Sequence, residues 1–166
     1  MKRLIKLIAA VLSFGAAAQE RTAVENNVAL WYDAFHKNDP SLLDQILADQ
    51  WVDIPPAPGQ LPGPQGAKQI LTELRTAFPD LTIEIRDVVA QGDKVVVRSE
   101  IAGTQRGSFL GRAAKGGKLK IQAIDIHEFQ NGKIVRTWHT EDWMTGLHQL
   151  GILEWRDRLP GAPAQR

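Results

Sequence analysis

Apolar side chains recur with the period of an α-helix through the first half of the chain. One stripe follows a capping box at Thr22 to Glu25 and predicts a helix ending near Asn38, a second predicts a short helix after Pro40, and a third predicts a helix that stops at Pro79. The stripes consist of Val24, Val28, Trp31 and Phe35; of Leu42, Leu43, Ile46 and Leu47; and of Ala67, Ile70, Leu71, Leu74 and Phe78. Prolines and glycines between residues 55 and 64 favour an irregular loop before the third helix.

After Asp80 the period changes to two, which is typical of β-strands. A Gly-Asp turn at 92–93 separates the first two expected strands, and an Asn-Gly turn at 131–132 joins the last two as a hairpin. The expected strands cover residues 81–86, a run containing 95–97, residues 119–129 and residues 134 to about 140, followed by a short helix within 143–153. Three helices followed by an antiparallel sheet predict an α+β fold, in which the helices cover one face of a curved sheet.

The composition narrows the class of protein. The chain has 166 residues, which suits one domain, and no cysteine, which excludes thiol nucleophiles, disulfides and thiolate metal sites. A net charge of +1 without a long basic run argues against a nucleic-acid-binding protein.

The first 18 residues have the pattern of a secretory signal peptide. A cationic start is followed by a short apolar stretch and by Ala16-Ala17-Ala18, which a signal peptidase recognises. The apolar stretch is shorter than the roughly 20 residues of a membrane-spanning helix. We therefore expect an exported, periplasmic or secreted protein, with residues 1–18 removed, no membrane anchor after cleavage, and residues 19–166 forming a single mildly acidic domain.

His127 and His139 lie on the two strands of the expected hairpin, where an imidazole is either a satisfied core group or a working base. A two-residue turn would place Asp125 and His139 on opposite sheet faces. A three-residue loop beginning at Gln130 would place Asp125 opposite Thr137 and diagonal to His139. In the second register, Asp125 orients His139 as a general base; the alternative is a polar pair that only bridges two strands.

Several motifs in order along the chain make it resemble the SnoaL-like polyketide cyclase (ester cyclase) family of the NTF2-like superfamily. These motifs are Trp31-Tyr32-Asp33-Ala34-Phe35, Trp51-Val52-Asp53, Ala77-Phe78-Pro79-Asp80, Gly103-Thr104 with Gly107, Phe109, Leu110 and Gly111, Asn131-Gly132-Lys133-Ile134, Trp138, Asp142 and Gln149-Leu150-Gly151. The resemblance implies a cone-shaped α+β barrel with a pocket between sheet and helices, no metal or organic cofactor, and a homo-oligomer, dimer or tetramer, formed on the outer sheet face. It also implies acid/base catalysis of an aldol-type ring closure.

Alignment with the family supports the second register and reverses its catalytic pair. Asp125 stands where the cyclases have a pocket histidine, and His139 stands where they have the catalytic aspartate. Ile54 and Gln105 replace two further family histidines, so the pocket is expected to be less polar than in typical relatives.

The candidate catalytic residues are therefore His139, Asp125 and Asp142, where Asp142 either orients the imidazole or caps the last helix. Tyr32, Phe35, Trp51, Asp53, Phe78, Phe109 and His127 are the candidate substrate-binding residues. A metal site is not expected, because His127, His139 and Asp125 lack a supporting third imidazole.

The leading hypothesis is an exported enzyme that performs cofactor-free aldol-type cyclisation, or the reverse lyase reaction, on a small hydrophobic, aromatic or polyketide-like carbonyl compound. The alternatives are a periplasmic binding protein for a small hydrophobic molecule and a hydrolase in which His139 activates water.

Overall fold

The computed structural model describes residues 27–154. The expected signal peptide and the capping box at residues 22–25 lie outside this range. The described part opens with an N-terminal helix, observed over residues 27–37. The elements that follow are α2 (Ser41–Ile46), β1 (Leu47–Ile54), α3 (Pro64–Ala77), β2 (Thr82–Gln91), β3 (Lys94–Thr104), β4 (Lys118–Gln130), β5 (Lys133–Glu141) and α4 (Trp143–Gln149).

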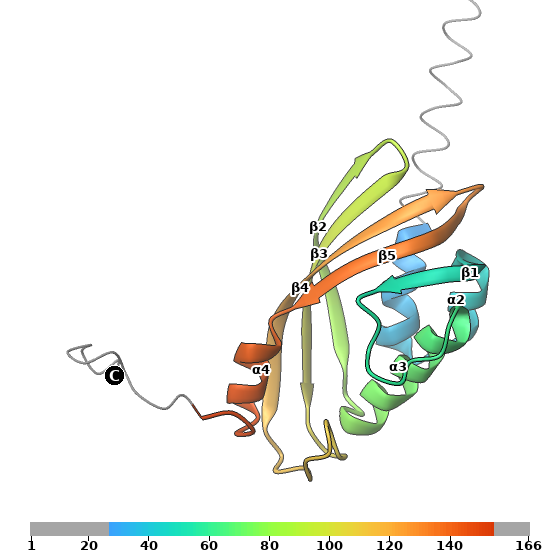
Figure 1. Cartoon of the computed structure of the whole chain (residues 1–166). Coiled ribbons are helices and arrows are strands. Elements are labelled where there is room, and N and C mark those ends of the chain that lie inside the picture. Colours follow the sequence, from blue (N-terminus) through green and yellow to red (C-terminus); the bar gives the residue numbers. More distant parts are fainter. Residues whose placement is uncertain (1–26, 155–166) are drawn as a thin grey trace, which may run out of the picture.

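The sheet is curved and has the strand order β1-β5-β4-β3-β2. Strands β2 to β5 are joined as consecutive antiparallel neighbours, as the period-two pattern predicts. The N-terminal helix and α3 lie on the concave side of the sheet, and α4 lies at the end of β5, away from them (Figure 1). This arrangement confirms the α+β fold expected from the sequence, with helices covering one face of a curved sheet.

Strand β1 is absent from the sequence prediction, which placed this segment in the lead-in to the proline-rich loop. It pairs in parallel with β5, with Asp53 opposite Thr137 and Ile54 opposite Trp138. Its inward side presents Trp51 and then, two residues later, the carboxylate of Asp53 where a second apolar residue would be expected. The apolar period of a strand is therefore interrupted. The strand brings Asp53 to the same side of the sheet as His139.

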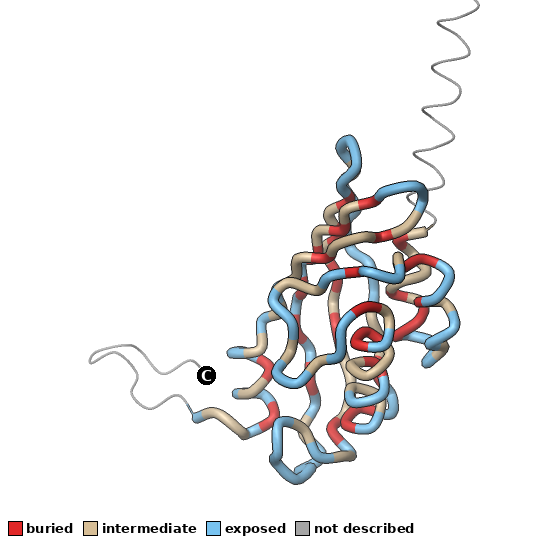
Figure 2. Tube along the Cα trace, turned by 45° about the vertical axis from the view of Figure 1, so that its right-hand side comes forward, coloured by how far each residue is buried: buried red, intermediate tan, exposed pale blue. Residues whose placement is uncertain are grey.

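Buried and more exposed residues alternate along β3 and β4, so these central strands have one inward and one outward side (Figure 2). The larger apolar cluster joins the N-terminal helix, α2 and α3 to the sheet through fully buried residues such as Leu43, Ile46 and Leu71. A second cluster, centred on Phe78, Leu81 and Leu119, closes the end of the sheet next to α4. The two clusters leave a hollow between the helices and the middle of the sheet, which is described below.

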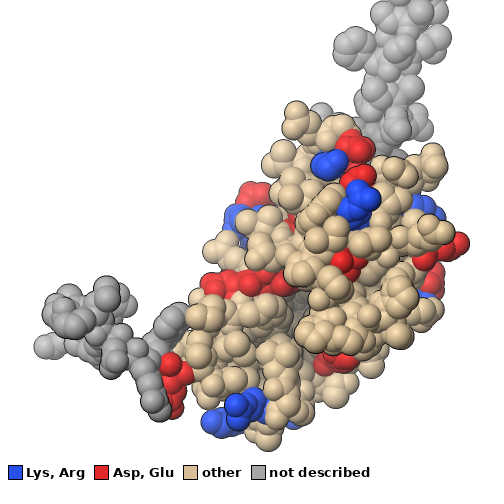
Figure 3. All heavy atoms as spheres, in the orientation of Figure 1, with Lys and Arg blue, Asp and Glu red and all other residues tan. Residues whose placement is uncertain are grey.

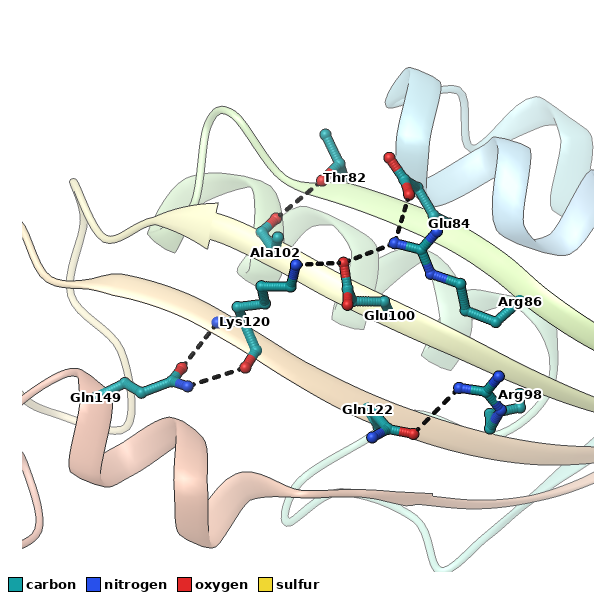
Figure 4. Close-up of polar contacts among 9 residues, drawn as sticks. All are labelled: Thr82, Glu84, Arg86, Arg98, Glu100, Ala102, Lys120, Gln122 and Gln149. Atoms are coloured by element: carbon teal, nitrogen blue, oxygen red, sulfur yellow. Dashed lines mark hydrogen bonds and ion pairs between the residues drawn. The ribbon is translucent and has the colours of Figure 1, made fainter. Parts of the chain in front are cut away.

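The outward side of the sheet carries a ladder of paired charges (Figure 4). Glu100 on β3 accepts from Arg86 of β2 at 2.8 Å and pairs with Lys120 of β4 at 3.1 Å. The Gln149 side chain bonds the backbone N–H and carbonyl of Lys120, which attaches α4 to β4. Exposed ion pairs contribute little stability each, so the ladder acts mainly by keeping this part of the sheet solvated.

Most of the face shown in Figure 3 is uncharged, with Lys and Arg scattered among Asp and Glu and one group of cations near its lower end. Within residues 27–154, no helix is both long and apolar enough to cross a membrane.

Candidate functional site

A cavity of about 80 Å³ lies between the sheet and the helices. Its walls are mainly apolar, and its polar groups come from the N-terminal helix and from four different strands. The apolar lining consists of Trp31, Phe35, Ala67, Ile70, Leu74, Ile83, Ile101 and Ala123, and the polar lining consists of Tyr32, Asp53, Ser99, Asp125, His139 and Glu141. Few convergent polar groups in an apolar cavity are typical of a small-molecule site.

The β4–β5 hairpin brings Asp125 and His139 together by a register that neither sequence alternative describes. The turn is the two-residue Asn131-Gly132, and both residues have positive φ, 51° and 76°. A bulge beyond Phe129 then shifts the pairing by one residue, so that Asp125 lies directly opposite His139 rather than diagonal to it. The expected three-residue loop is therefore wrong, and the bulge restores the shared face that the two-residue turn would have abolished.

His139 is held between hydrogen-bond acceptors at both ring nitrogens. Its Nδ1 lies 2.9 Å from Oε1 of Glu141, and its Nε2 lies 3.0 Å from the carbonyl oxygen of Pro55 and 3.3 Å from Oδ1 of Asp53. Beside an ionised Glu141 and the Pro55 carbonyl, which only accept, both nitrogens carry a proton and the ring is an imidazolium. The hydrogen bond to Glu141, chiefly, raises the pKa of His139 to about 9.

Asp53 completes the surroundings of His139 from β1. Its Oδ2 accepts from Nε2 of Gln60 at 2.9 Å, and the Gln60 carbonyl oxygen, Oε1, accepts from the backbone N–H of Ala57 at 2.7 Å. Burial raises the pKa of Asp53, although Gln60 and His139 both stabilise its anion. The irregular loop after β1 is thus fastened to the cavity through Gln60, and it supplies the Pro55 carbonyl to His139.

Asp125 is buried on β4 and bonded to the only tyrosine of the chain. The Tyr32 hydroxyl donates to Oδ2 of Asp125 at 2.7 Å. Burial raises the pKa of Asp125 to about 6, and the Tyr32 hydrogen bond opposes that rise. At neutral pH the carboxylate is therefore ionised, poorly solvated and able to accept a proton.

These protonation states differ from those expected from the sequence. His139 was expected to be the base and Asp125 its orienting carboxylate, yet no hydrogen bond joins them within the described residues. Glu141, which the sequence analysis did not single out, is the residue that holds the imidazole. The sequence contained a signal for Glu141, because residues two positions apart on one strand, such as His139 and Glu141, lie on the same face of the sheet.

The structure divides the other candidates between the cavity and its surroundings. Tyr32, Phe35 and Asp53 line the cavity, whereas Trp51, Phe78, Phe109 and His127 do not. Phe109 packs between Phe78 and Trp143 in the second apolar cluster. Asp142 is exposed and accepts from the Thr145 N–H at 3.1 Å, which makes it the N-cap of α4 rather than a cavity residue.

In the part of the chain that the structure describes, no three His, Asp or Glu side chains are arranged to hold a metal ion. The arrangement that exists is a buried carboxylate and a protonated imidazole side by side on the sheet face that lines a small apolar cavity.

Comparison with known proteins places this geometry among related structures. The family model for SnoaL-like polyketide cyclases matches residues 26–150. TsrD from Streptomyces laurentii is similar, with 28% identity and a TM-score of 0.75 over 80% of this chain and 98% of that one. IdmH from Streptomyces antibioticus has 26% identity and a TM-score of 0.67 over 77% and 98% of the two chains.

A SnoaL-like polyketide cyclase from Agrobacterium tumefaciens shares the fold at 19% identity, with a TM-score of 0.64 over 77% of this chain and 98% of that one. Comparison with curated protein sequences gives no match.

Proposed function

The chain belongs to the SnoaL-like polyketide cyclase family, and we propose that it is an acid/base enzyme in which Asp125 is the base and His139 the acid. The observation that supports this proposal most strongly is the double hydrogen bonding of His139 to acceptors, opposite a buried Asp125. The pair suits removal of a proton α to a carbonyl group, followed by aldol-type carbon–carbon bond formation or cleavage.

Asp125 would begin the cyclisation by accepting the α-proton through the carboxylate oxygen that faces the cavity. The electron pair of the broken C–H bond passes to the carbonyl oxygen as an enolate, beside the His139 imidazolium. The enolate carbon then forms a bond to a second carbonyl carbon of the same molecule, and the resulting alkoxide takes the proton back from Asp125, which restores the carboxylate. In the reverse direction, Asp125 takes the hydroxyl proton and the carbon–carbon bond breaks.

The size of the cavity limits the substrate. One water-sized position takes roughly 10–15 Å³, so a cavity of 80 Å³ holds the equivalent of roughly six such positions, about the volume of one six-membered ring. The walls from Phe35, Ile70 and Leu74 are apolar, and the one cation among the lining residues, the His139 imidazolium, already donates to Glu141 and Pro55. We infer a neutral, single-ring carbonyl compound as the part of the substrate that enters the cavity.

The geometry argues against one of the two alternative functions, the hydrolase, and is compatible with the other, the binding protein. A hydrolase in which His139 activates water needs a neutral imidazole, and a ring that donates from both nitrogens has no free lone pair. A binding protein remains the alternative of a different class, since a small apolar cavity suits a bound ligand as well as a substrate.

The experiment is exchange of the α-protons of 4-phenylbutan-2-one in deuterated buffer, followed by NMR with wild type, Asp125→Asn and His139→Gln. We expect catalysed exchange by wild type and a loss of roughly 10²–10⁴-fold in Asp125→Asn, because the base is removed. Binding of the ketone should change only a few-fold, since the asparagine keeps the shape of the site. Retro-aldol cleavage of 4-hydroxy-4-phenylbutan-2-one, read as benzaldehyde, tests the full reaction in parallel.

Phe109→Leu is the matched control, because Phe109 lies outside the cavity lining and its loss should leave exchange unchanged. Exchange that is equal in wild type and Asp125→Asn, with the ketone still bound, would support the binding protein instead.

Export remains a proposal of its own, tested by whether the protein recovered outside the cytoplasm of expressing cells begins at Gln19.

A further inference from the structure

The hydrogen bonding of Asp125 does not end at Tyr32. The Tyr32 oxygen also lies 3.1 Å from Nε2 of His127, the Nδ1 of His127 lies 3.1 Å from the Thr137 hydroxyl, and Nε1 of Trp51 donates to that hydroxyl at 3.0 Å. These contacts connect the N-terminal helix with β4, β5 and β1. The proposed reaction uses none of the three outer residues, His127, Thr137 and Trp51.

All members of this chain of hydrogen bonds are buried. Thr137 and His127 have 0% of their surface exposed, and Tyr32 and Trp51 have 3% each. A buried donor or acceptor without a partner is costly, so each proton in this chain of hydrogen bonds has a strong preference for a position in which every link is made.

Chemistry fixes the direction of the links from both ends. An ionised Asp125 only accepts, so the single hydroxyl proton of Tyr32 points to Asp125, and the Tyr32 oxygen must accept from Nε2–H of His127. At the other end, the Trp51 indole only donates, so the Thr137 oxygen accepts from it.

Burial lowers the pKa of His127 to about 3, so the ring is neutral and carries one proton. With that proton on Nε2, Nδ1 is bare and accepts from the Thr137 hydroxyl. Every donor in the chain therefore points towards Asp125, and every link is satisfied.

We propose that Trp51, Thr137 and His127 are positioning residues. They keep the Tyr32 hydroxyl donating its hydrogen bond to Asp125, and so keep Asp125 ionised as the base. The proposal rests on the function proposed above, in which Asp125 accepts the substrate proton. It also gives a reason for a histidine that is fully buried, uncharged and outside the cavity.

Other charged groups around Asp125 also influence its ionisation, in addition to the hydrogen bond from Tyr32. Glu141 and Asp53 oppose its ionisation and His139 favours it, while the cavity lining from α3 is apolar. Tyr32 is the hydrogen-bond donor that stabilises the anion. The side-chain hydrogen bonds of Thr137 and Trp51 involve none of these groups, so the effect of a change at either residue on Asp125 reports transmission through the chain of hydrogen bonds.

The first test is the tautomer of His127 in the full-length protein, read from ¹⁵N NMR of histidine-labelled wild type at pH 7.5 without any ligand. We expect the Nε2–H tautomer. The Nδ1–H tautomer would overturn the proposal, because Tyr32 would then donate to His127 instead of Asp125. This measurement does not depend on turnover, so a failure of the proposed reaction leaves it interpretable.

The second test is the titration of the Asp125 carboxyl carbon by ¹³C NMR in Thr137→Val and Thr137→Ser. The valine keeps the shape but removes the hydroxyl, and we expect the pKa of Asp125 to rise by a few tenths to one unit. The serine restores the hydroxyl and should restore the wild-type titration. An unchanged titration in Thr137→Val, or no recovery in Thr137→Ser, would contradict transmission along the chain.

Tyr32→Phe is the reference variant, since it removes the last link and should raise the pKa of Asp125 more than Thr137→Val does. If Thr137→Val does not fold, Trp51→Phe removes the terminal donor with the threonine intact, and the same rise is expected. No rise in either variant that folds would overturn the proposal.

Discussion

The acid/base chemistry proposed for the cavity depends on three protons: the two on His139 and the one on the Tyr32 hydroxyl. Glu141 and Pro55 accept from the imidazole, and Asp125 accepts from the tyrosine. The sequence revealed that Asp125 and His139 were candidates, but their roles depend on contacts from Glu141 and from the loop after β1. The periodicity of the sequence predicts the face on which a residue lies but not its protonation state. The proposed acid and base could therefore be assigned only with the structure.

At the residue scale, the pairing of His139 with Glu141 makes stability depend on pH. The folded-state pKa of about 9 lies above the ordinary 6.5, so the contribution is complete below pH 6.5 and is lost as pH rises through 9. We expect wild type to lose about 2 kcal/mol of unfolding free energy between pH 6.5 and 9. Urea denaturation at the two pH values measures the loss.

Glu141→Gln is the matched variant, because the amide oxygen can still accept from Nδ1 but the negative charge is gone. Its stability should fall less over the same range. An equal fall in the two proteins would show that Glu141 does not hold the charge of His139.

At the scale of elements, the sequence predicted the helices, four of the five strands and both tight turns. It missed β1, whose inward carboxylate interrupts the apolar pattern, and it missed the bulge in β5. The bulge adds one residue to β5, Val135, between the partners of Phe129 and Glu128, and no local residue pattern requires it at that point. The face on which His139 lies therefore depends on packing that the hairpin sequence does not encode.

The loop that supplies Pro55 is constrained where it meets α3. A Cβ on Gly66 would lie 2.0 Å from the Leu61 carbonyl oxygen and 3.0 Å from Cγ of Gln60, the residue that bonds Asp53. Gly66→Ala should displace the loop and reduce the unfolding free energy by about 1–3 kcal/mol. Chemical denaturation checks this, with exposed Gln65→Ala as the control; equal stabilities of the two variants would contradict it.

At the scale of the whole molecule, the outward side of the sheet carries an apolar row that crosses all five strands. Cross-strand pairing joins Val89, Val96, Ile126, Trp138 and Ile54 in that order. Charges of both signs flank the row, among them Asp87 with Arg98 and Glu128 with Arg136. Such a surface is self-complementary under a two-fold rotation, which is the commonest symmetry of oligomers.

We therefore expect a dimer or tetramer that uses this row, as the sequence resemblance implies. Sedimentation equilibrium should give a multiple of the chain mass for wild type and the monomer mass for Ile126→Lys, which places a charge within the row. Gln65→Lys, on the helical side, should remain oligomeric. A monomeric wild type would contradict the expectation.

The most direct test of the assigned acid and base is the protonation state of His139 in the folded protein. Titration of its ring nitrogens by ¹⁵N NMR should show an imidazolium at pH 7.5 that loses its proton with a pKa near 9. A ring that is neutral at pH 7.5, with a pKa at or below the ordinary value, would contradict the account, because His139 would then be the base and Asp125 its support.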